Sequence, residues 1–465
     1  MNRIDCRTGK RGDSALPTSI LATRDISLQG GTIVLPDRVI AGGTLTIRGG
    51  KITALAGPGA AGEGAAVATA GVEGGYGGLG VAGCGNGGPA VDVAGSASLT
   101  APGAGQVHRV ITVDVSGRYV CPGFIDLHVH GGGGHGFDWQ QPWTEWEQVA
   151  RVHARHGVTG LLATVPAPHG AWHLLHEFRQ EVAGKRWDGS TILGLHLEGP
   201  YLSPARRGCW PESSLRLPRP DDCRALLEAA GPVLKIITLA PELPGAMECI
   251  SLLAAAGVAV AMGHTDATYD QAVRAARAGA RKVTHLYNAM RVLHHREPGA
   301  AGAALDLAGV TAEIICDGVH VHPAAMRLAL RARGVDGLNL VTDASPLAGA
   351  PDPGIEVPFG QFPVRIVDGA CRTPDGSLAG SLLTIDQAVA NAVRLLDIPI
   401  WEAVRMASLV PARSIGIAQR KGSLEQGKDA DIAILDSDFK VEATFIGGCL
   451  VYVAPEAAGR YKIRY

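Results

Sequence analysis

The sequence has no excess of charge of either sign and few aromatic residues. Its 465 residues carry 42 Lys plus Arg against 44 Asp plus Glu, a formal net charge of −2, and only 5% of them are Phe, Trp or Tyr. A near-neutral chain offers no global field that would attract nucleic acid or an anionic membrane. We therefore expect neither as a partner, and any anionic ligand must be met by local groups.

Paired cysteines and long hydrophobic runs are also missing. The nine cysteines are odd in number, scattered and free of any C-x-x-C pair, which is typical of reduced thiols in the cytoplasm. The longest apolar run, from about Leu252 to Met262, is far shorter than the ~20 residues of a spanning helix. The charged N-terminal segment has no apolar core, so the sequence indicates neither export nor anchoring and favours a cytoplasmic location.

One segment near the N-terminus is rich in small residues. Residues 57–107 contain 17 Gly and 12 Ala among 51 positions, with almost no large apolar side chain. Because so little apolar surface can offset the entropy of ordering, we expect a flexible insertion. Alternating stretches of strand type flank it, so the insertion is expected to interrupt a small β domain that covers residues 20–118.

From residue 119 the pattern changes to short β-rich runs separated by stretches with helical spacing. The eight runs are Tyr119 to Val129, Gly157 to Val165, Ile192 to Glu198, Leu234 to Leu239, Val258 to Gly263, Lys282 to Tyr287, Ala312 to Asp317 and Leu338 to Asp343. Such repeats predict a parallel sheet, and their number and total length fit a (β/α)8 TIM barrel over residues 119–415. A doubly wound α/β sheet with a separate β domain is the alternative.

The tail returns to alternating strands with Gly turns. We expect residues 416–465 to rejoin the N-terminal segment as one small β-sandwich domain that is split across the sequence.

Reactive side chains follow six of the eight predicted strands. Catalytic groups of a TIM barrel lie at the carboxyl ends of its strands, and the alternation of a strand places His128 and His130 on one face. The other strand ends carry Glu198, His264, His285, His320 and Asp343. The remaining histidines that we considered have no comparable placement and are interpreted as surface or loop residues.

Imidazoles and carboxylates gathered at one barrel mouth predict a metal centre. Glu198, His264 and His285 supply three protein ligands and leave an open coordination position, which suits catalysis by Zn²⁺. His128 and His130 allow a second ion beside the first, with Glu198 bridging. The same ligands also suit Fe²⁺, Mn²⁺ and Co²⁺, so the pattern leaves open both the metal and the choice between one and two ions per subunit.

These residues, in this order, resemble the amidohydrolase superfamily and, within it, the N-acetylglucosamine-6-phosphate deacetylase family. The segments that carry the match are PGFIDLHVHG, GLHLEGPYLSP, GHTDA, THLYNAM, REPG, CDGVH, LVTDA, LAGS and RMASLVPARSIG, which lie between residues 122 and 416. Together they are far more specific than any one of them.

The resemblance implies roles for individual residues. Glu198, His264 and His285 match the metal ligands, His128 and His130 match an extra pair found in members with two ions, and Asp343 matches the catalytic acid/base. The positions that match substrate-binding residues are Asn288, Ala289, Arg296, His320, Leu378, Ala379 and Gly380. In relatives the Arg at the position of Arg296 reaches the phosphate in the neighbouring subunit, which implies a homodimer.

The resemblance also implies the reaction. It is hydrolysis of the acetamide of N-acetylglucosamine 6-phosphate to glucosamine 6-phosphate and acetate, with metal-bound water as nucleophile and Asp343 as general base and then acid. One position departs from the family: after Cys209, at the place of a small residue, Trp210 stands where relatives have a His or Gln near the substrate amide. That departure keeps an alternative substrate open, N-acetylgalactosamine 6-phosphate or another N-acyl amino sugar. A non-catalytic sugar-phosphate-binding scaffold is a further alternative.

Overall fold

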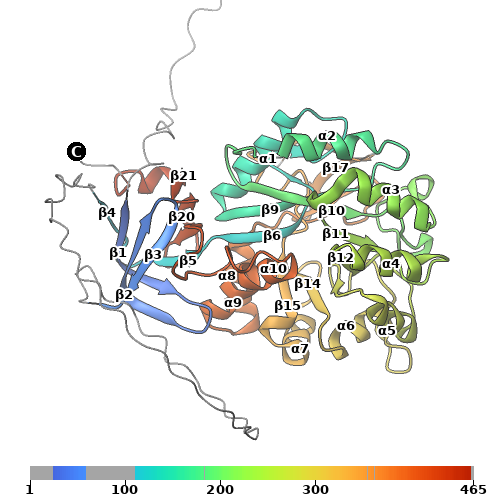
Figure 1. The fold of residues 1–465 in the computed structure, drawn as a ribbon. Coiled ribbons are helices and arrows are strands. Elements are labelled where there is room, and N and C mark those ends of the chain that lie inside the picture. The colour runs from blue at the N-terminus through green and yellow to red at the C-terminus, as the bar shows by residue number, and fades with distance from the viewer. Residues whose placement is uncertain (1–24, 59–109, 183, 353, 361, 462–465) are drawn as a thin grey trace, which may run out of the picture.

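The computed structural model describes residues 25–58, 110–182, 184–352, 354–360 and 362–461. They form a barrel of parallel strands wrapped by helices and, beside it, a smaller β domain built from both ends of the described chain (Figure 1). The expected insertion at residues 57–107 lies almost entirely outside the described residues. Within them, no helix is both long enough and apolar enough to cross a membrane.

Eight parallel strands make up the barrel, which confirms the predicted fold class. In chain order they are β6 (Phe124–Val129), β9 (Val158–Val165), β10 (Thr191–Glu198), β11 (Leu234–Leu239), β12 (Ala259–Met262), β13 (Lys282–Val283), β14 (Thr311–Ile315) and β15 (Leu338–Val341). Each pairs with the next in sequence, and the two end strands meet where Thr342 Oγ1 donates to Asp126 Oδ2 at 2.6 Å and Asp343 N donates to His128 O at 3.0 Å. The sheet is therefore closed at its carboxyl end.

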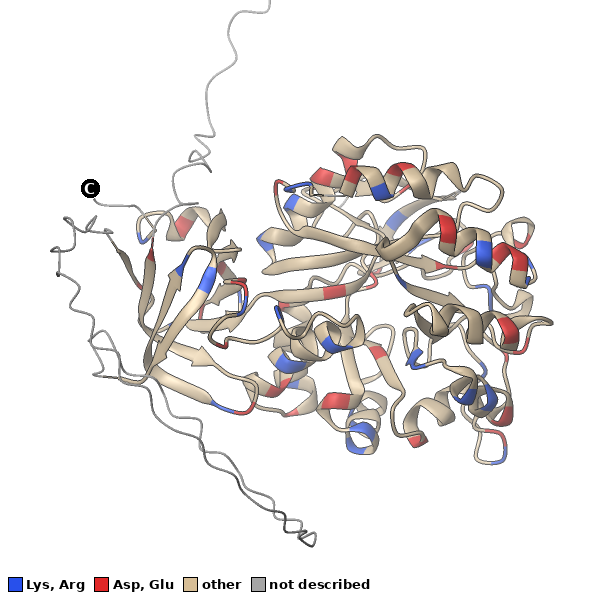
Figure 2. Ribbon diagram, viewed as in Figure 1, with Lys and Arg blue, Asp and Glu red and all other residues tan. Residues whose placement is uncertain are grey.

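Helices, most of them amphipathic, cover the outside of this sheet. They are α1 (Trp143–Arg155), α2 (His173–Val182), α3 (Pro220–Ala230), α4 (Ala246–Ala255), α5 (Tyr269–Ala278), α6 (Gly299–Asp306), α7 (Pro323–Arg333), α8 (Ile385–Leu396), α9 (Ile400–Ala407) and α10 (Leu409–Ser414). Local signals set their bounds: Thr268 and Gln271 form a capping box at the start of α5, and Pro220 begins α3. Acidic and basic residues are interspersed over these helices in the view of Figure 2.

The strands divide apolar from polar side chains by alternation. In β10, Leu195 and Leu197 join the large hydrophobic cluster that includes the helices, whereas His196 and Glu198 contact residues of other strands. The interior of the barrel consequently holds a polar layer beneath its carboxyl mouth.

The small domain is one eight-stranded sheet. Its strands are β1 (Ile26–Val34), β2 (Val39–Arg48), β3 (Lys51–Ala56), β4 (Ile111–Asp114), β5 (Tyr119–Pro122), β19 (Ile432–Leu435), β20 (Val441–Ile446) and β21 (Cys449–Val453). The first half of β1 pairs with β4 and the second half with β5, with a register shift of the neighbouring β2 at Gln29 and Gly31. The hydrogen bonds thus link all eight strands of the small domain into one continuous sheet.

Strand β19 joins the two ends of the chain and the two domains. It pairs antiparallel with β5 over four residues, from Ile432 opposite Pro122 to Leu435 opposite Tyr119. Ile432 and Ile434 lie in the core of the small sheet, whereas Ala433 and Leu435 lie in the core of the barrel. The C-terminal segment therefore completes the small sheet, as the sequence predicted.

Short strands outside the eight-strand pattern were not predicted. A sheet of β16 (Val357–Phe359), β17 (Phe362–Val367) and β18 (Ala370–Arg372) follows the last barrel strand, and β7 (Gly131–Gly132) pairs with β8 (His135–Gly136) after the first. The prediction also made the sixth barrel strand too long: β13 ends at Val283, because the chain leaves extended backbone at His285, where φ is 29°.

Candidate active site

The six clustered groups that the sequence placed at strand ends come together at the carboxyl mouth of the barrel. His128 lies on β6, Glu198 ends β10, and three of the others, His264, His285 and Asp343, follow their strands with left-handed backbone at φ values of 47°, 29° and 50°. Residues other than Gly adopt this backbone conformation at a cost of about 1–3 kcal/mol each, and such strained residues are concentrated at functional sites. The strained backbone turns these side chains toward a common point.

The first group is formed by Glu198, His264 and His285. Glu198 Oε1 lies 3.1 Å from His264 Nε2 and 3.2 Å from His285 Nε2, and the two imidazole nitrogens are 3.1 Å apart. All three side chains are buried, and one ligand atom of each lies within 4.8 Å of the others.

The second group, His128, His130 and Asp343, lies directly beside the first. His128 Nε2 lies 3.2 Å from His130 Nε2, and Asp343 Oδ1 is 3.4 Å from the former nitrogen and 3.3 Å from the latter. Glu198 stands between the groups, with Oε1 3.5 Å from His128 Nε2 and Oε2 3.5 Å from His130 Nε2. The structure therefore brings all six residues into one cluster.

Each imidazole is held by the nitrogen that faces away from the cluster. Nδ1 of His130, His264 and His285 lies 3.0–3.2 Å from the backbone carbonyls of residues 164, 206 and 288, and Nδ1 of His128 lies 3.1 Å from Glu313 Oε2. Carbonyl and carboxylate oxygens accept only, so they fix a proton on Nδ1 and make Nε2 the nitrogen through which each ring can bind a metal ion. Four Nε2 atoms consequently face the cluster.

The charges in the cluster support one another. Burial disfavours ionisation of Glu198, yet the imidazoles of His264 and His285 hold the pKa of this carboxyl well below its usual value. Burial likewise opposes ionisation of Asp343, and His128 and His130 hold its pKa low. Burial disfavours a charged His128, but Asp343, Glu313 and Glu198 raise the pKa of this imidazole to about 10. The two carboxylates are therefore ionised, and a cation bound at Nε2 of His128 must displace a proton.

This donor set fits a divalent metal ion. Lone pairs on neutral imidazole and on carboxylate are the ligands that Zn²⁺ and its neighbours prefer, and the Nδ1 contacts are the outer-shell support that such ligands usually have. A third group, His128, His196 and Glu313, is also compact. It does not fit an ion, because His196 uses both nitrogens, at 3.1 Å from Leu127 O and 2.7 Å from Thr238 Oγ1.

Glu313 and Lys282 are polar residues of the site that sequence reasoning missed. Both are fully buried inside the barrel, and Glu313 contacts His128 directly. A signal was present, since an acidic residue in the middle of the apolar strand TAEII has no reason to be there unless it faces a polar interior.

Trp210 contacts the cluster from a loop after β10. Its indole Nε1 donates to Glu198 Oε2 at 3.1 Å, and its ring lies 6.4 Å from that of Phe359, which packs edge-on against His130 at 5.0 Å. Phe359 belongs to the unpredicted sheet of β16–β18, and Cys209 packs partly buried against the core of that sheet. Trp210 and Phe359 thus form an aromatic wall beside the cluster.

The predicted substrate-binding residues fall into two sets. Asn288 and Ala289 continue the loop of His285: the Asn288 amide donates to His285 O at 3.3 Å, and Ala289 has left-handed backbone with φ of 47°. Arg296 contacts none of the six clustered residues. Its side chain is exposed, and guanidinium Nη1 lies 2.9 Å from His295 Nε2.

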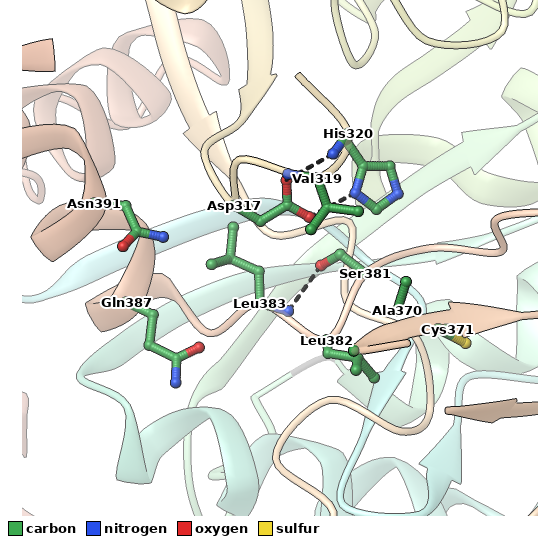
Figure 3. Close-up of a pocket in the computed structure, with 11 residues that line it drawn as sticks. Asp317, Val319, His320, Ala370, Cys371, Ser381, Leu382, Leu383, Gln387 and Asn391 are labelled. Carbon is green, nitrogen blue, oxygen red and sulfur yellow. Dashed lines mark hydrogen bonds and ion pairs between the residues drawn. The ribbon is translucent and has the colours of Figure 1, made fainter. Parts of the chain in front are cut away.

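The second set is His320, which lines a cavity of about 170 Å³, and the segment Leu378–Gly380, which leads into that cavity at Ser381. Figure 3 shows His320 and Asp317 paired at one edge, with Nδ1 2.6 Å from Oδ2, and Gln387 and Asn391 of α8 at another. Ser381, which follows the predicted Leu378–Gly380 segment, lines the cavity and donates its backbone N–H to Asp343 O at 2.7 Å. A Cβ on Gly380 would meet Asp343 O at 2.9 Å, so this segment packs tightly against the backbone of Asp343.

Comparison with known proteins finds the same family throughout. The model of the amidohydrolase family matches residues 119–451. The chain is 39% identical to the N-acetylglucosamine-6-phosphate deacetylase of Vibrio furnissii over 340 residues, which is 72% of this chain and 83% of that protein. It is also 39% identical to the N-acetylgalactosamine-6-phosphate deacetylase of Escherichia coli over 332 residues, 71% of this chain and 87% of that protein.

Solved structures agree with the sequence matches. A variant of N-acetyl-D-glucosamine-6-phosphate deacetylase from Mycobacterium smegmatis, in complex with N-acetyl-D-glucosamine-6-phosphate, superposes with a TM-score of 0.76 at 30% identity, covering 92% of this chain and all of that one. The corresponding enzyme of Pasteurella multocida also gives a TM-score of 0.76, at 29% identity and the same coverage. With its metal-type cluster at the mouth of a parallel barrel, the chain belongs to the amidohydrolase family.

Proposed function

We propose that this protein is an N-acetylglucosamine-6-phosphate deacetylase, which hydrolyses the acetamide of the sugar phosphate to glucosamine 6-phosphate and acetate. The observation that carries the proposal is the convergence of Glu198, His264, His285, His128, His130 and Asp343 at one barrel mouth. Similarity to deacetylases of the same substrate over more than 70% of the chain supports the choice of reaction.

Asp343 is the acid/base in this proposal. An acetamide resists hydrolysis because its carbonyl is weakly electrophilic and its nitrogen leaves poorly. The ionised Asp343 carboxylate, low in pKa and next to His128 and His130, takes the proton of the attacking water. It then delivers that proton to the nitrogen as the C–N bond breaks, so one carboxylate acts first as base and then as acid.

Glu198, His264 and His285 would hold one divalent ion, and His128, His130 and Asp343 a second, with Glu198 shared between them. When bound, such an ion lowers the pKa of water from 15.7 toward about 7 and polarises a carbonyl oxygen. We propose Zn²⁺ as the native metal, because imidazole-rich sites of this kind suit it, with Fe²⁺, Mn²⁺ and Co²⁺ as alternatives.

The substrate phosphate is met by local donors. A phosphomonoester carries roughly −1.5 to −2 charges near neutral pH, and a guanidinium binds it with paired, charge-assisted hydrogen bonds. Arg296 is exposed on a loop and has no contact with the clustered groups. We therefore propose that it reaches the substrate of a second subunit in a homodimer, while Asn288, the backbone N–H of Ala289 and His320 bind the sugar phosphate within the same subunit. Seven free cysteines among the described residues support a reducing, cytoplasmic location.

Acetate release tests the proposal. The protein is stripped of metal with a chelator, reconstituted with Zn²⁺, and assayed with N-acetylglucosamine 6-phosphate and with the unphosphorylated sugar. We expect turnover that depends on the metal and strongly favours the phosphorylated substrate. No acetate release from any reconstituted form would contradict the enzyme assignment and favour a sugar-phosphate-binding scaffold.

A second substrate is favoured by specific observations. The relative from Escherichia coli acts, by its name, on N-acetylgalactosamine 6-phosphate, and Trp210 occupies an unusual position beside Glu198. Comparing kcat/KM for the two epimers decides between them, and a higher value for the galactosamine epimer would replace the first proposal with the second.

A further inference from the structure

Two oppositely charged side chains lie beneath the clustered groups, out of contact with solvent. Glu313 comes from the middle of β14 and is 0% exposed, and Lys282 begins β13 and is 1% exposed. Lys282 Nζ lies 3.6 Å from Glu313 Oε1, and in the described part of the chain neither atom has a hydrogen-bond partner. The pair is therefore held by charge alone on that side.

A buried pair of this kind is a poor source of stability. The cost of removing two charges from water commonly exceeds their mutual attraction, and apolar residues of similar volume are often as stable or more so. Lys282 and Glu313 consequently call for an explanation other than holding the barrel together.

The other carboxylate oxygen of Glu313 points to that explanation. Glu313 Oε2 lies 3.1 Å from His128 Nδ1. The remaining three imidazoles of the cluster meet backbone carbonyls at this atom. A carbonyl is fixed by the chain, whereas a side-chain carboxylate can rotate away. Lys282 lies at the other carboxylate oxygen, Oε1, and holds the Glu313 carboxylate in place. It thereby does for His128 what the fixed backbone carbonyls do for His130, His264 and His285.

His196 restrains the same imidazole from another side. Its ring meets that of His128 at 4.6 Å with an interplanar angle of 74°. Its own nitrogens are fixed by Leu127 O and Thr238 Oγ1, and Thr238 Oγ1 lies 2.7 Å from Thr284 Oγ1. The orientation of the His128 ring is thus fixed by packing against His196 and by the contact of Nδ1 with Glu313.

We propose that Lys282 and Glu313 are a positioning pair for His128, which keeps the Nδ1 proton directed at Glu313 and Nε2 directed at the ion shared by His128, His130 and Asp343. The inference rests on the proposed two-ion function. It also separates the two ions, because within the residues that the structure describes Glu313 contacts His128 and Lys282 contacts Glu313, and neither is bonded to Glu198, His264 or His285. Loss of the pair should weaken one ion and spare the other.

The test uses paired substitutions, because removing one partner leaves the other charge buried and alone. In Lys282→Met with Glu313→Leu, both charges and the acceptor for His128 are gone. In Lys282→Met with Glu313→Gln, an acceptor oxygen remains. A control replaces an ion pair of the small domain, the partly buried Lys421 and the buried Asp431, 2.5 Å apart, by Met and Asn. Zn²⁺ and Co²⁺ binding is followed by chelator competition, and the visible bands of Co²⁺ report each site.

We expect the Met/Leu variant to fold, to bind the first ion as the wild type does, and to bind the second about 10–100-fold more weakly, as is usual when an outer-shell partner of a ligand is lost. The Met/Gln variant should recover most of this loss, and the control should bind both ions normally. Wild-type affinity for both ions in the Met/Leu variant would overturn the proposal, as would equal weakening of both.

A second measurement is independent of metal and of activity. A hydrogen bond from His128 Nδ1–H to a buried carboxylate gives a downfield imidazole proton resonance that exchanges slowly with water, and histidine-labelled protein without metal shows it directly. We expect this resonance in the wild type and its loss in the Met/Leu variant and in His128→Asn. Its persistence in the Met/Leu variant would refute the positioning role, even if the wild type binds a single ion or the acetate assay fails.

Discussion

Replacement of Asp343 by Asn removes a proton acceptor and leaves the shape of the site in place. Asn has the same size as Asp and tolerates the left-handed backbone, with φ of 50°, that places residue 343 beside His128 and His130. Its amide nitrogen cannot take a proton from water. General acid–base catalysis contributes about 10²- to 10⁴-fold to rate, so kcat should fall by that factor, which is about 3–5 kcal/mol in the barrier.

The assay measures acetate release at saturating substrate on protein reconstituted with Zn²⁺, together with metal content and the midpoint of thermal unfolding. The ion at Glu198, His264 and His285 should remain, because Asp343 contacts His128 and His130 and not that group's ligand atoms at bonding distance. Asp386→Asn is the control, since Asp386 also pairs with a histidine, His156 at 3.1 Å, but does so at the start of α8. Near-normal kcat in the Asp343 variant would remove this residue from the mechanism.

Three other perturbations have defined outcomes. Trp210→Phe removes the hydrogen-bond donor to Glu198 Oε2 and should lower kcat/KM for the acetylated sugar phosphate about tenfold, the value of one hydrogen bond to a charged group. Trp210→His should keep more activity. Equal kcat/KM in the wild type and both variants would show that the indole has no role. Arg296→Ala should raise KM for the phosphorylated sugar about tenfold or more and leave kcat/KM for the unphosphorylated one unchanged, and a parallel loss on both substrates would contradict phosphate binding. Burial lowers the pKa of His153 from 6.5, its value in the unfolded chain, to about 4 in the folded protein. Between these two pH values the unfolded chain binds a proton at His153 that the folded protein does not bind. The free energy of unfolding therefore falls as the pH drops. From pH 7 to pH 5 this group should account for about 2 kcal/mol of that loss, and denaturant unfolding of His153→Gln should show a correspondingly smaller pH dependence.

Periodicity and strand-end chemistry predicted most of what positions the site. The alternation that put His128 and His130 on one face, and the rule that parallel strands end at one mouth, were sufficient to group residues that are more than 200 positions apart in sequence. Local residues also set the bounds of the helix Pro323–Arg333, because a proline begins it and Gly334 follows it.

Contacts across the interior of the barrel could not be predicted in this way. Glu313 and Lys282 meet because β13 and β14 are neighbours with one register, and a register is a property of the closed sheet. Phe359 reaches His130 from a small sheet whose strands are only three to six residues long, and strands that short carry little periodic signal. The end of the sixth strand was misjudged because left-handed backbone at His285 is imposed by the site and contradicts local preference.

The pairing of β5 with β19 has a consequence for synthesis of the chain. The ribosome releases β5 first, then roughly 300 residues of barrel, and only then its partner strand, a delay of about 15–60 s at usual elongation rates. During that interval one edge of β5 has open backbone hydrogen-bonding groups, the kind of edge at which chains aggregate. Closure of the sheet at Ile432 and Leu435 therefore has to wait until the whole barrel has been synthesised, and a nascent chain that stops short of β19 keeps an open edge that the folded protein covers.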